Sequence, residues 1–270
     1  MGDTAQGRVL IVAGSDSGGG AGIQADIKTV TALGGYAMTA ITALTAQNTQ
    51  GVFGVVGIEP DFIVQQMRLV LDDTGADVVK TGMLHNAAVI EAVCTVLEEY
   101  GLPLVADPVM FAKGGHALLE PEAVSAVQQW LIPLATVLTP NIPEAEALID
   151  RPITGIGDMP DAAKTIAELG AAAVLLKGGH LEGDELSDIL YTNSGVQRWD
   201  DTRIDTAHTH GTGCTLASAV ATGMAQGLTL PKAVDRARAY VRDAILNAPG
   251  LGKGHGPLGH GHTVSPYPNT

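Results

Sequence analysis

Short, largely apolar segments recur along the chain, each followed by a glycine- or proline-containing turn and then by a segment of helical length. The clearest of them are 8–13, 37–44, 78–83, 104–110, 136–139 and 173–177. Alternation of strands and helices along a chain predicts βαβ units and a parallel sheet. Strands without a polar face are typical of sheets that helices cover on both sides. We therefore expect an α/β fold, a three-layer α/β/α sandwich with a mostly parallel central sheet.

One segment, 188–199, breaks this alternation. Two short runs of strand-forming residues flank Asn193, Ser194 and Gly195, which form a compact turn signal. The pattern predicts an antiparallel hairpin at the edge of the sheet. The chain has 270 residues and no visible linker or tandem repeat, so we expect a single domain over 1–270, with flexible ends at 1–7 and 263–270.

The chain is acidic, with 29 Asp and Glu against 15 Lys and Arg, a net charge of −14. This charge repels nucleic acid and anionic membrane surfaces, so we expect neither as a partner. No apolar run is long enough to span a membrane, and Cys94 and Cys214 form no disulfide pattern. We therefore expect a cytoplasmic protein. A phosphate site would need backbone amides and local lysines, with Lys113, Lys177 and Lys253 as candidates.

The segment 208–216 joins a glycine-broken turn to an alanine-rich stretch of helical length. Gly211 and Gly213 allow the amides of the turn, including that of Thr212, to point towards one anion, and the first amides of a helix lack partners within it. Cys214 lies in the same field, where a helix N-terminus lowers the pKa of a thiol and lets it accept a proton from an alcohol. This pattern predicts phosphoryl transfer to a hydroxyl group. The alternative is a common turn followed by a buried apolar cysteine.

A second glycine-rich loop, 14–26, follows the first expected strand. It lacks the Gly-Lys-Ser/Thr ending of a P-loop and fits a dinucleotide-binding motif poorly, so we expect it to approach a small, flat substrate. Asp26, at the end of this segment, either belongs to that site or lies on a solvated helix face.

Asn141 and Glu144 follow the strand 136–139. Glu144 can hold Mg²⁺ directly or through water, but the same spacing matches a helix N-cap with a capping-box glutamate. Asp107 is a second carboxylate that either binds the metal or belongs to an ordinary turn. The histidines of 208–210 and 255–262 show no compact ligand spacing, so we expect no zinc site. Ligands of open parallel sheets bind beyond the carboxyl ends of the strands, where these polar clusters lie.

Taken together, these motifs resemble those of the hydroxymethylpyrimidine/phosphomethylpyrimidine kinases of thiamin biosynthesis, within the ribokinase-like superfamily. The similarity runs in order through 13–26, 41–49, 80–84, 107–110, 138–145, 176–180, 208–216 and 252–254. It implies a ribokinase-like fold and ATP-dependent phosphorylation of 4-amino-5-hydroxymethyl-2-methylpyrimidine to its monophosphate and then to the diphosphate. Related sugar kinases carry Asp where this chain has Cys214, which favours the pyrimidine branch.

The resemblance also implies residue roles. Pyrimidine binding is implied for Gln47, Gly14, Ala21, Asp26, Met83 and Val109. Nucleotide binding is implied for Asn141, Lys177 and Lys253, and Mg²⁺ binding for Asp107 and Glu144. The catalytic anion hole would consist of Gly211, Thr212, Gly213 and Cys214.

The same resemblance implies ATP and Mg²⁺ as cofactors and a homodimer as the assembly, and it leaves a role for a monovalent cation open. Two alternative functions also stay open. One is a pyridoxal or pyridoxine kinase of vitamin B6 salvage, which can share the Gly-Thr-Gly-Cys turn. The other is a catalytically silent pyrimidine-binding protein.

Overall fold

The computed structural model describes residues 6–111, 118–119 and 123–264. Its nine-stranded sheet has the order β3-β2-β1-β4-β5-β6-β7-β8-β9. The strands are β1 (Arg8–Asp16), β2 (Tyr36–Asn48), β3 (Gly51–Gly57), β4 (Val78–Thr81), β5 (Leu104–Ala106), β6 (Val137–Leu138), β7 (Ala173–Lys177), β8 (Glu185–Thr192) and β9 (Gly195–Thr202). The α-helices are α1 (Gly22–Ala32), α2 (Pro60–Asp73), α3 (Ala87–Tyr100), α4 (Ala123–Ala126), α5 (Ile142–Ile149), α6 (Met159–Ala167), α7 (Thr212–Ala225) and α8 (Leu230–Leu246).

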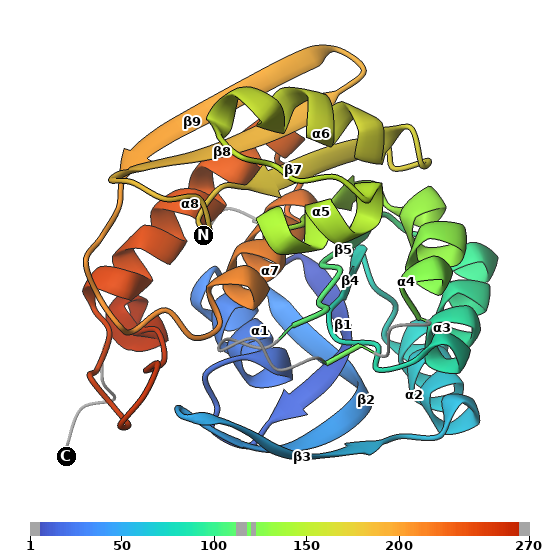
Figure 1. Cartoon of the computed structure of the whole chain (residues 1–270). Helices are drawn as coiled ribbons and strands as arrows, with labels where there is room; N and C mark the ends of the chain where they lie inside the picture. The colour runs from blue at the N-terminus through green and yellow to red at the C-terminus, as the bar shows by residue number, and fades with distance from the viewer. Residues whose placement is uncertain (1–5, 112–117, 120–122, 265–270) are drawn as a thin grey trace, which may run out of the picture.

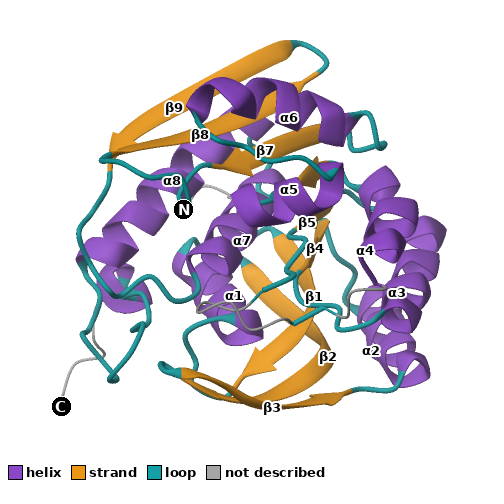
Figure 2. Ribbon diagram, in the orientation of Figure 1, coloured by secondary structure: helices purple, strands orange, loops and turns teal. Residues whose placement is uncertain are grey.

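Helices cover both faces of this sheet, with α2, α3 and α4 on one side and α1, α7 and α8 on the other (Figures 1 and 2). Successive residues of β1 point into two separate cores: Leu10 and Val12 pack with α2 and α3, whereas Val9 and Ile11 pack with α7 and α8. Both faces of the strand are therefore removed from water, which explains why its sequence is apolar throughout. The expected three-layer α/β/α sandwich is confirmed.

The strand pairing also agrees with expectation over most of the sheet. Parallel ladders join β2, β1, β4, β5, β6 and β7. The predicted hairpin is confirmed by β8 and β9, which pair antiparallel at one edge. The opposite edge carries β3, which pairs antiparallel with β2 and was not predicted.

Local signals set both ends of α3. Asn86 caps α3 by accepting a hydrogen bond from the Val89 amide, and Gly101 ends it with a φ of +61°, a left-handed conformation that glycine adopts at little cost. Within the described residues, no helix combines the length and the apolar character needed to cross a bilayer. The expected flexible ends fall largely outside those residues.

Because the central strands are parallel, their carboxyl ends meet at one edge of the sheet. The turns after β1, β4, β5, β6 and β7 therefore converge there, and the N-terminus of α7 faces them. This edge carries the candidate site.

Candidate active site

A cavity of about 820 Å³ lies at the carboxyl edge of the parallel strands. This volume lies in the range of small-molecule and cofactor sites. Among the described residues that the sequence analysis assigned to the site, all but two line this cavity: Gly14, Ala21, Gln47, Met83, Asp107, Val109, Asn141, Glu144, Lys177, Gly211, Thr212, Gly213 and Cys214. The two exceptions are Asp26 and Lys253.

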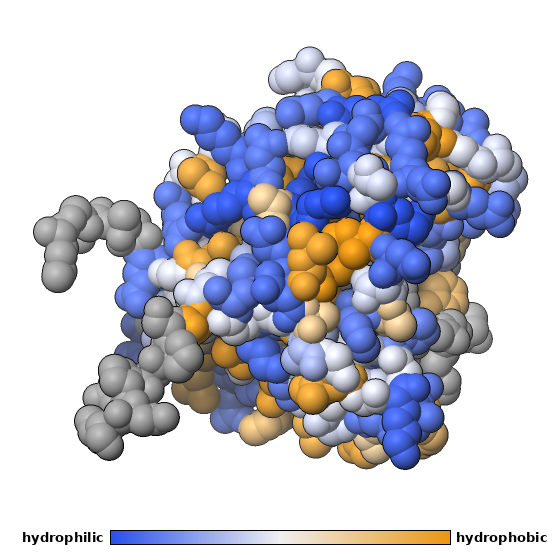
Figure 3. Space-filling view, turned by 90° about the vertical axis from the view of Figure 1, so that its left-hand side faces the viewer, coloured by the Kyte–Doolittle hydropathy of each residue, from blue (hydrophilic) through white to orange (hydrophobic). Residues whose placement is uncertain are grey.

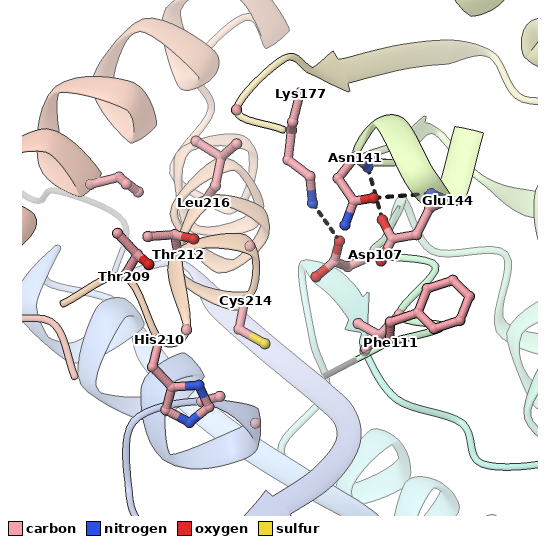
Figure 4. Close-up of a pocket in the computed structure, with 18 of the residues that line it drawn as sticks. Asp107, Phe111, Asn141, Glu144, Lys177, Thr209, His210, Thr212, Cys214 and Leu216 are labelled. Atoms are coloured by element: carbon pink, nitrogen blue, oxygen red, sulfur yellow. Dashed lines mark hydrogen bonds and ion pairs between the residues drawn. The ribbon is translucent and has the colours of Figure 1, made fainter. Parts of the chain in front are cut away.

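The N-terminus of α7 forms one wall of the cavity, opposite Asp107 and Glu144 (Figure 4). Gly211 is the N-cap with a φ of +89°, and a Cβ atom there would overlap the carbonyl oxygen of Gly20. A Cβ atom on Gly213 would lie 3.3 Å from Lys177 Nζ. The glycines thus bring the amides of the helix terminus against a lysine, an arrangement suited to an anion.

Lys177 and Asp107 form a buried ion pair on the facing wall. Lys177 Nζ donates to Asp107 Oδ1 at 3.0 Å, and the Thr139 hydroxyl donates to the same oxygen at 3.0 Å. Burial alone would lower the pKa of Lys177, but the carboxylates of Asp107 and Glu144 outweigh it and raise that pKa. Lys177 therefore stays charged at neutral pH and can bind phosphate.

Glu144 and Asn141 form a capping box at the start of α5. Asn141 Oδ1 accepts from the Glu144 amide at 3.0 Å, and Glu144 Oε2 accepts from the Asn141 amide at 2.8 Å. The capping interpretation is thus confirmed. Burial raises the pKa of Glu144 to about 7, with the charge of Lys177 opposing the rise and that of Asp107 adding to it. This concentration of carboxylate oxygen fits a hard divalent cation such as Mg²⁺, which would relieve the repulsion.

Cys214 points from the first turn of α7 into the space in front of Asp107 and Phe111 (Figure 4). The expectation of a lowered thiol pKa is wrong for this structure. Burial raises the pKa of Cys214 to about 12, and Asp26 and Asp107 add to the rise, while Lys80 and the Gly22 amide oppose it. The helix terminus alone does not overcome the desolvation of the thiolate.

Asp26 lies beneath the cavity and is not among the residues that line it. Its side chain is completely buried, and both carboxylate oxygens accept from Lys80 Nζ at 2.9 Å. The Ser218 hydroxyl donates to the same carboxylate at 2.7 Å. Lys80 itself lines the cavity. Asp26 is therefore the counter-ion that holds Lys80 in place. The one sequence feature that could have revealed this ion pair is the presence of a lysine within an apolar strand.

Lys253 is likewise not among the residues that line the cavity. Its side chain is exposed outside the cavity lining, and its backbone amide donates to the Thr49 hydroxyl at 3.1 Å. Lys113 falls outside the described residues.

Asp16 and His210 were not assigned to the site, yet they join its two glycine-rich segments. Asp16 accepts from the amides of Gly20 and Ala21 at 3.0 and 2.9 Å, and His210 Nε2 lies 2.9 Å from its Oδ2. Burial raises the pKa of Asp16, but the bonds from His210 and the loop amides outweigh it and lower that pKa overall. His210 Nε2 also lies 3.3 Å from Gln47 Nε2. Asp16 thus fixes the first loop against the segment that leads into α7.

The far end of the cavity has an apolar wall formed by β8, α8 and the segment after β9, with Leu186, Ile204, Val241 and Ile245. Arg238 lies beside this wall and donates to Asp188 and Asp201 at 2.8 and 2.9 Å. Figure 3 shows one face of the molecule, on which apolar residues gather near the middle between hydrophilic ones. The cavity therefore combines an amide- and charge-rich middle with an apolar end that suits a flat base.

Comparison with known proteins gives concordant matches. A family model described as phosphomethylpyrimidine kinase matches residues 16–259. A hydroxymethylpyrimidine/phosphomethylpyrimidine kinase of Bacillus subtilis is 46% identical over 255 residues, covering 94% of this chain and 94% of that protein. The thiamine biosynthesis bifunctional protein ThiED of Geobacter sulfurreducens is 52% identical over 256 residues, and the match covers 94% of this chain and 52% of that longer protein. This chain thus spans about half of the bifunctional protein.

A solved structure is similar over nearly its whole length. The crystal structure of an ADP complex of Bacillus subtilis pyridoxal kinase has a TM-score of 0.87 and 37% sequence identity. The alignment covers 95% of this chain and 98% of that chain.

Proposed function

Because this chain belongs to the phosphomethylpyrimidine kinase family, we propose that it transfers phosphate from ATP to hydroxymethylpyrimidine and then to the resulting monophosphate. The family resemblance drawn from the sequence motifs is confirmed, and the chain is a phosphotransferase of this group. The observation that carries the two-step proposal is the convergence of Gly211–Cys214, the Lys177–Asp107 pair and Gln47 on one cavity.

We assign the pyrimidine to the end of the cavity lined by Gly14, Gln47, Met83 and Val109. A Cβ atom on Gly14 would lie 3.1 Å from Met83 Sδ, so this wall leaves little depth and favours a flat ring. The amide of Gln47 both donates and accepts hydrogen bonds, as the ring nitrogen and exocyclic amine of an aminopyrimidine require.

We assign the triphosphate to the middle of the cavity, between the α7 amides and Lys177. Asn141 lies beside this pair at the start of α5. Asp107 and Glu144 would hold Mg²⁺, which when bound neutralises charge on the phosphates during transfer. The amides at the start of α7 then stabilise the charge that develops on the transferred group.

In the first step, the substrate hydroxyl attacks the γ-phosphorus, the bond to the ADP oxygen breaks, and Cys214 takes the hydroxyl proton as a thiolate. Lys80 is the buried positive charge that favours this thiolate. In the second step the acceptor is already a phosphate oxygen, which needs no base. Cys214 should therefore matter mainly for the first transfer.

The test is turnover by the purified chain with ATP and Mg²⁺, with hydroxymethylpyrimidine and its monophosphate offered separately and the products resolved by mass. We expect each acceptor to gain one phosphate. Binding of pyrimidine without any transfer would overturn the proposal in favour of a silent binder.

Pyridoxal is a second candidate acceptor because of the similarity to a pyridoxal kinase structure. The same assay with pyridoxal separates the two. If pyridoxal turns over and neither pyrimidine does, the chain is a vitamin B6 kinase.

We also propose that one domain spanning the chain acts as a homodimer in the cytoplasm, where ATP is available and both cysteines stay reduced. Both described cysteines are free thiols. The support for a dimer is the β3 edge, where Phe53 is 72% and Val56 64% exposed. Large apolar side chains gathered on an edge strand favour contact with a second copy.

A further inference from the structure

Arg203 links two segments that flank the proposed phosphate region in the middle of the cavity. It directly follows β9 and opens the segment that runs to Gly211 at the start of α7. Its side chain reaches the loop 178–184, which begins right after Lys177. Arg203, Gly179 and His180 all line the cavity. The Arg203 side chain thus connects the loop 178–184, which follows Lys177, to the segment that leads into the N-terminus of α7.

The guanidinium of Arg203 binds three alternate carbonyls of this loop. Nη1 donates to Gly179 at 2.9 Å, Nη2 to Leu181 at 2.6 Å, and Nε to Gly183 at 2.9 Å. The Arg203 backbone amide also donates to the Asp184 carbonyl at 2.8 Å. A planar guanidinium presents five donors on three nitrogens in a fixed arrangement, whereas a lysine ammonium carries its three donors on one nitrogen.

Two glycines of the loop lie in open space. A Cβ atom added to Gly179 or Gly183 would meet no atom within 4 Å, and Gly183 has a φ of +100°. At its base, the Gly178 amide donates to Asp188 Oδ1 at 3.1 Å, and a Cβ atom on Gly178 would overlap the Ser187 carbonyl oxygen. The first residue is therefore fixed against β8. Leu181 packs against the core, and its amide donates to the Gly178 carbonyl at 3.0 Å, while Arg203 holds the carbonyls of Gly179, Leu181 and Gly183.

We propose that Arg203 is a positioning residue for the nucleotide: it holds the loop 178–184 in the shape that completes the ATP side of the cavity. This inference rests on the proposed location of the triphosphate beside Lys177. A loop that is ordered before binding does not have to lose conformational freedom when the nucleotide arrives, so the affinity for nucleotide is higher. The pyrimidine end of the cavity, around Gln47, has no bond from Arg203 among the described interactions.

The test compares Arg203→Lys with Arg198→Lys as a matched control. Arg198 lies on β9 as well, but it pairs with the exposed acids Glu185 and Asp200 and does not line the cavity. We expect R203K to weaken ADP binding, measured by calorimetry without acceptor, by about tenfold. The KM for ATP should rise in parallel, while kcat and the KM for the acceptor change less than about twofold. R198K should leave all four values unchanged.

An unchanged ADP affinity in R203K, or a fall in thermal stability with no change in the KM for ATP, would overturn the proposal. If R203K does not fold, Gly183→Ala disturbs one of the bonded carbonyls while leaving Arg203 intact, and it should weaken ADP binding too. Normal ADP affinity in folded G183A would then overturn the proposed role of Arg203. Because ADP binding needs no acceptor, this result is independent of whether hydroxymethylpyrimidine is the substrate.

Discussion

Lys80→Met would remove the positive charge from a completely buried ion pair while keeping a side chain of similar length. Lys80 and Asp26 are both 0% exposed, and Lys80 supplies two of the three hydrogen bonds described for the Asp26 carboxylate. Only the bond from Ser218 would remain. Breaking one side of a buried pair leaves an uncompensated charge and costs about 3–5 kcal/mol. We expect the free energy of unfolding to fall by that amount.

Equilibrium urea unfolding, followed by circular dichroism, measures this loss. The matched control is the double variant Lys80→Met with Asp26→Leu, which removes both charges. Replacing a whole buried pair by apolar side chains is often neutral, so the double variant should recover most of the lost stability. A loss below about 1 kcal/mol in the single variant, typical of exposed pairs, would show that Lys80 and Asp26 do not behave as a buried ion pair. So would a double variant no more stable than the single one.

Lys80→Met should also make the Cys214 thiol harder to deprotonate. Lys80 opposes the rise of the Cys214 pKa, so its loss should raise that pKa above its present value of about 12. The rate of Cys214 alkylation by iodoacetamide should then fall at every pH below that value. The measurement requires a Cys94→Ala background, so that alkylation reports only Cys214.

Three further predictions concern the site and the assembly. Cys214→Ala should slow the first phosphorylation at least about tenfold more than the second. Because the pKa of Cys214 is raised, the rate of the first step in the wild type should increase as pH rises above neutral. Equal loss of both steps in a folded variant would contradict this role. Gly211→Ala should lower kcat/KM at least about tenfold, since the φ of Gly211 is +89° and a Cβ there would overlap the Gly20 carbonyl. The control is Gly227→Ala, at φ +82° with open space around it, which should lower stability but not activity. Equal activity in the two variants would argue against a specific need for glycine at 211. Phe53→Asp should convert a dimer of the 27.7 kDa chain to monomers, as measured by light scattering. Val196→Asp, at the opposite edge of the sheet, should leave the dimer intact. A monomeric wild type would contradict the proposed dimer.

Much of the fold could be predicted because burial on two faces leaves a local signal. The β1 strand is apolar at every position that packs into either core, and the turn at Asn193–Gly195 marks the β8–β9 hairpin. The strand β3 gave no such signal. It lies at the edge with Phe53 and Val56 exposed and with glycines at 51, 54 and 57, so neither alternation nor an apolar run identifies it.

Only those parts of the candidate site could be predicted whose positions follow from the order and direction of the strands. Residues after parallel strands share one edge, and so Asp107, Asn141 and Lys177 meet as expected. The Lys80–Asp26 and Asp16–His210 pairs join distant parts of the chain through tertiary packing, which no local pattern encodes. The pKa of Cys214 could not be inferred either, because burial and neighbouring carboxylates outweigh the helix terminus that the sequence reveals.

We propose that the cavity selects an aminopyrimidine alcohol as the acceptor of the phosphate from ATP. The most direct measurement is the ratio of kcat/KM for hydroxymethylpyrimidine to that for pyridoxal, under saturating ATP and Mg²⁺, in the wild type and in Gln47→Leu. We predict a ratio well above one that falls in Q47L, because the amide recognises the pyrimidine edge. A ratio below one in the wild type would show that pyridoxal is the preferred acceptor and would contradict this assignment.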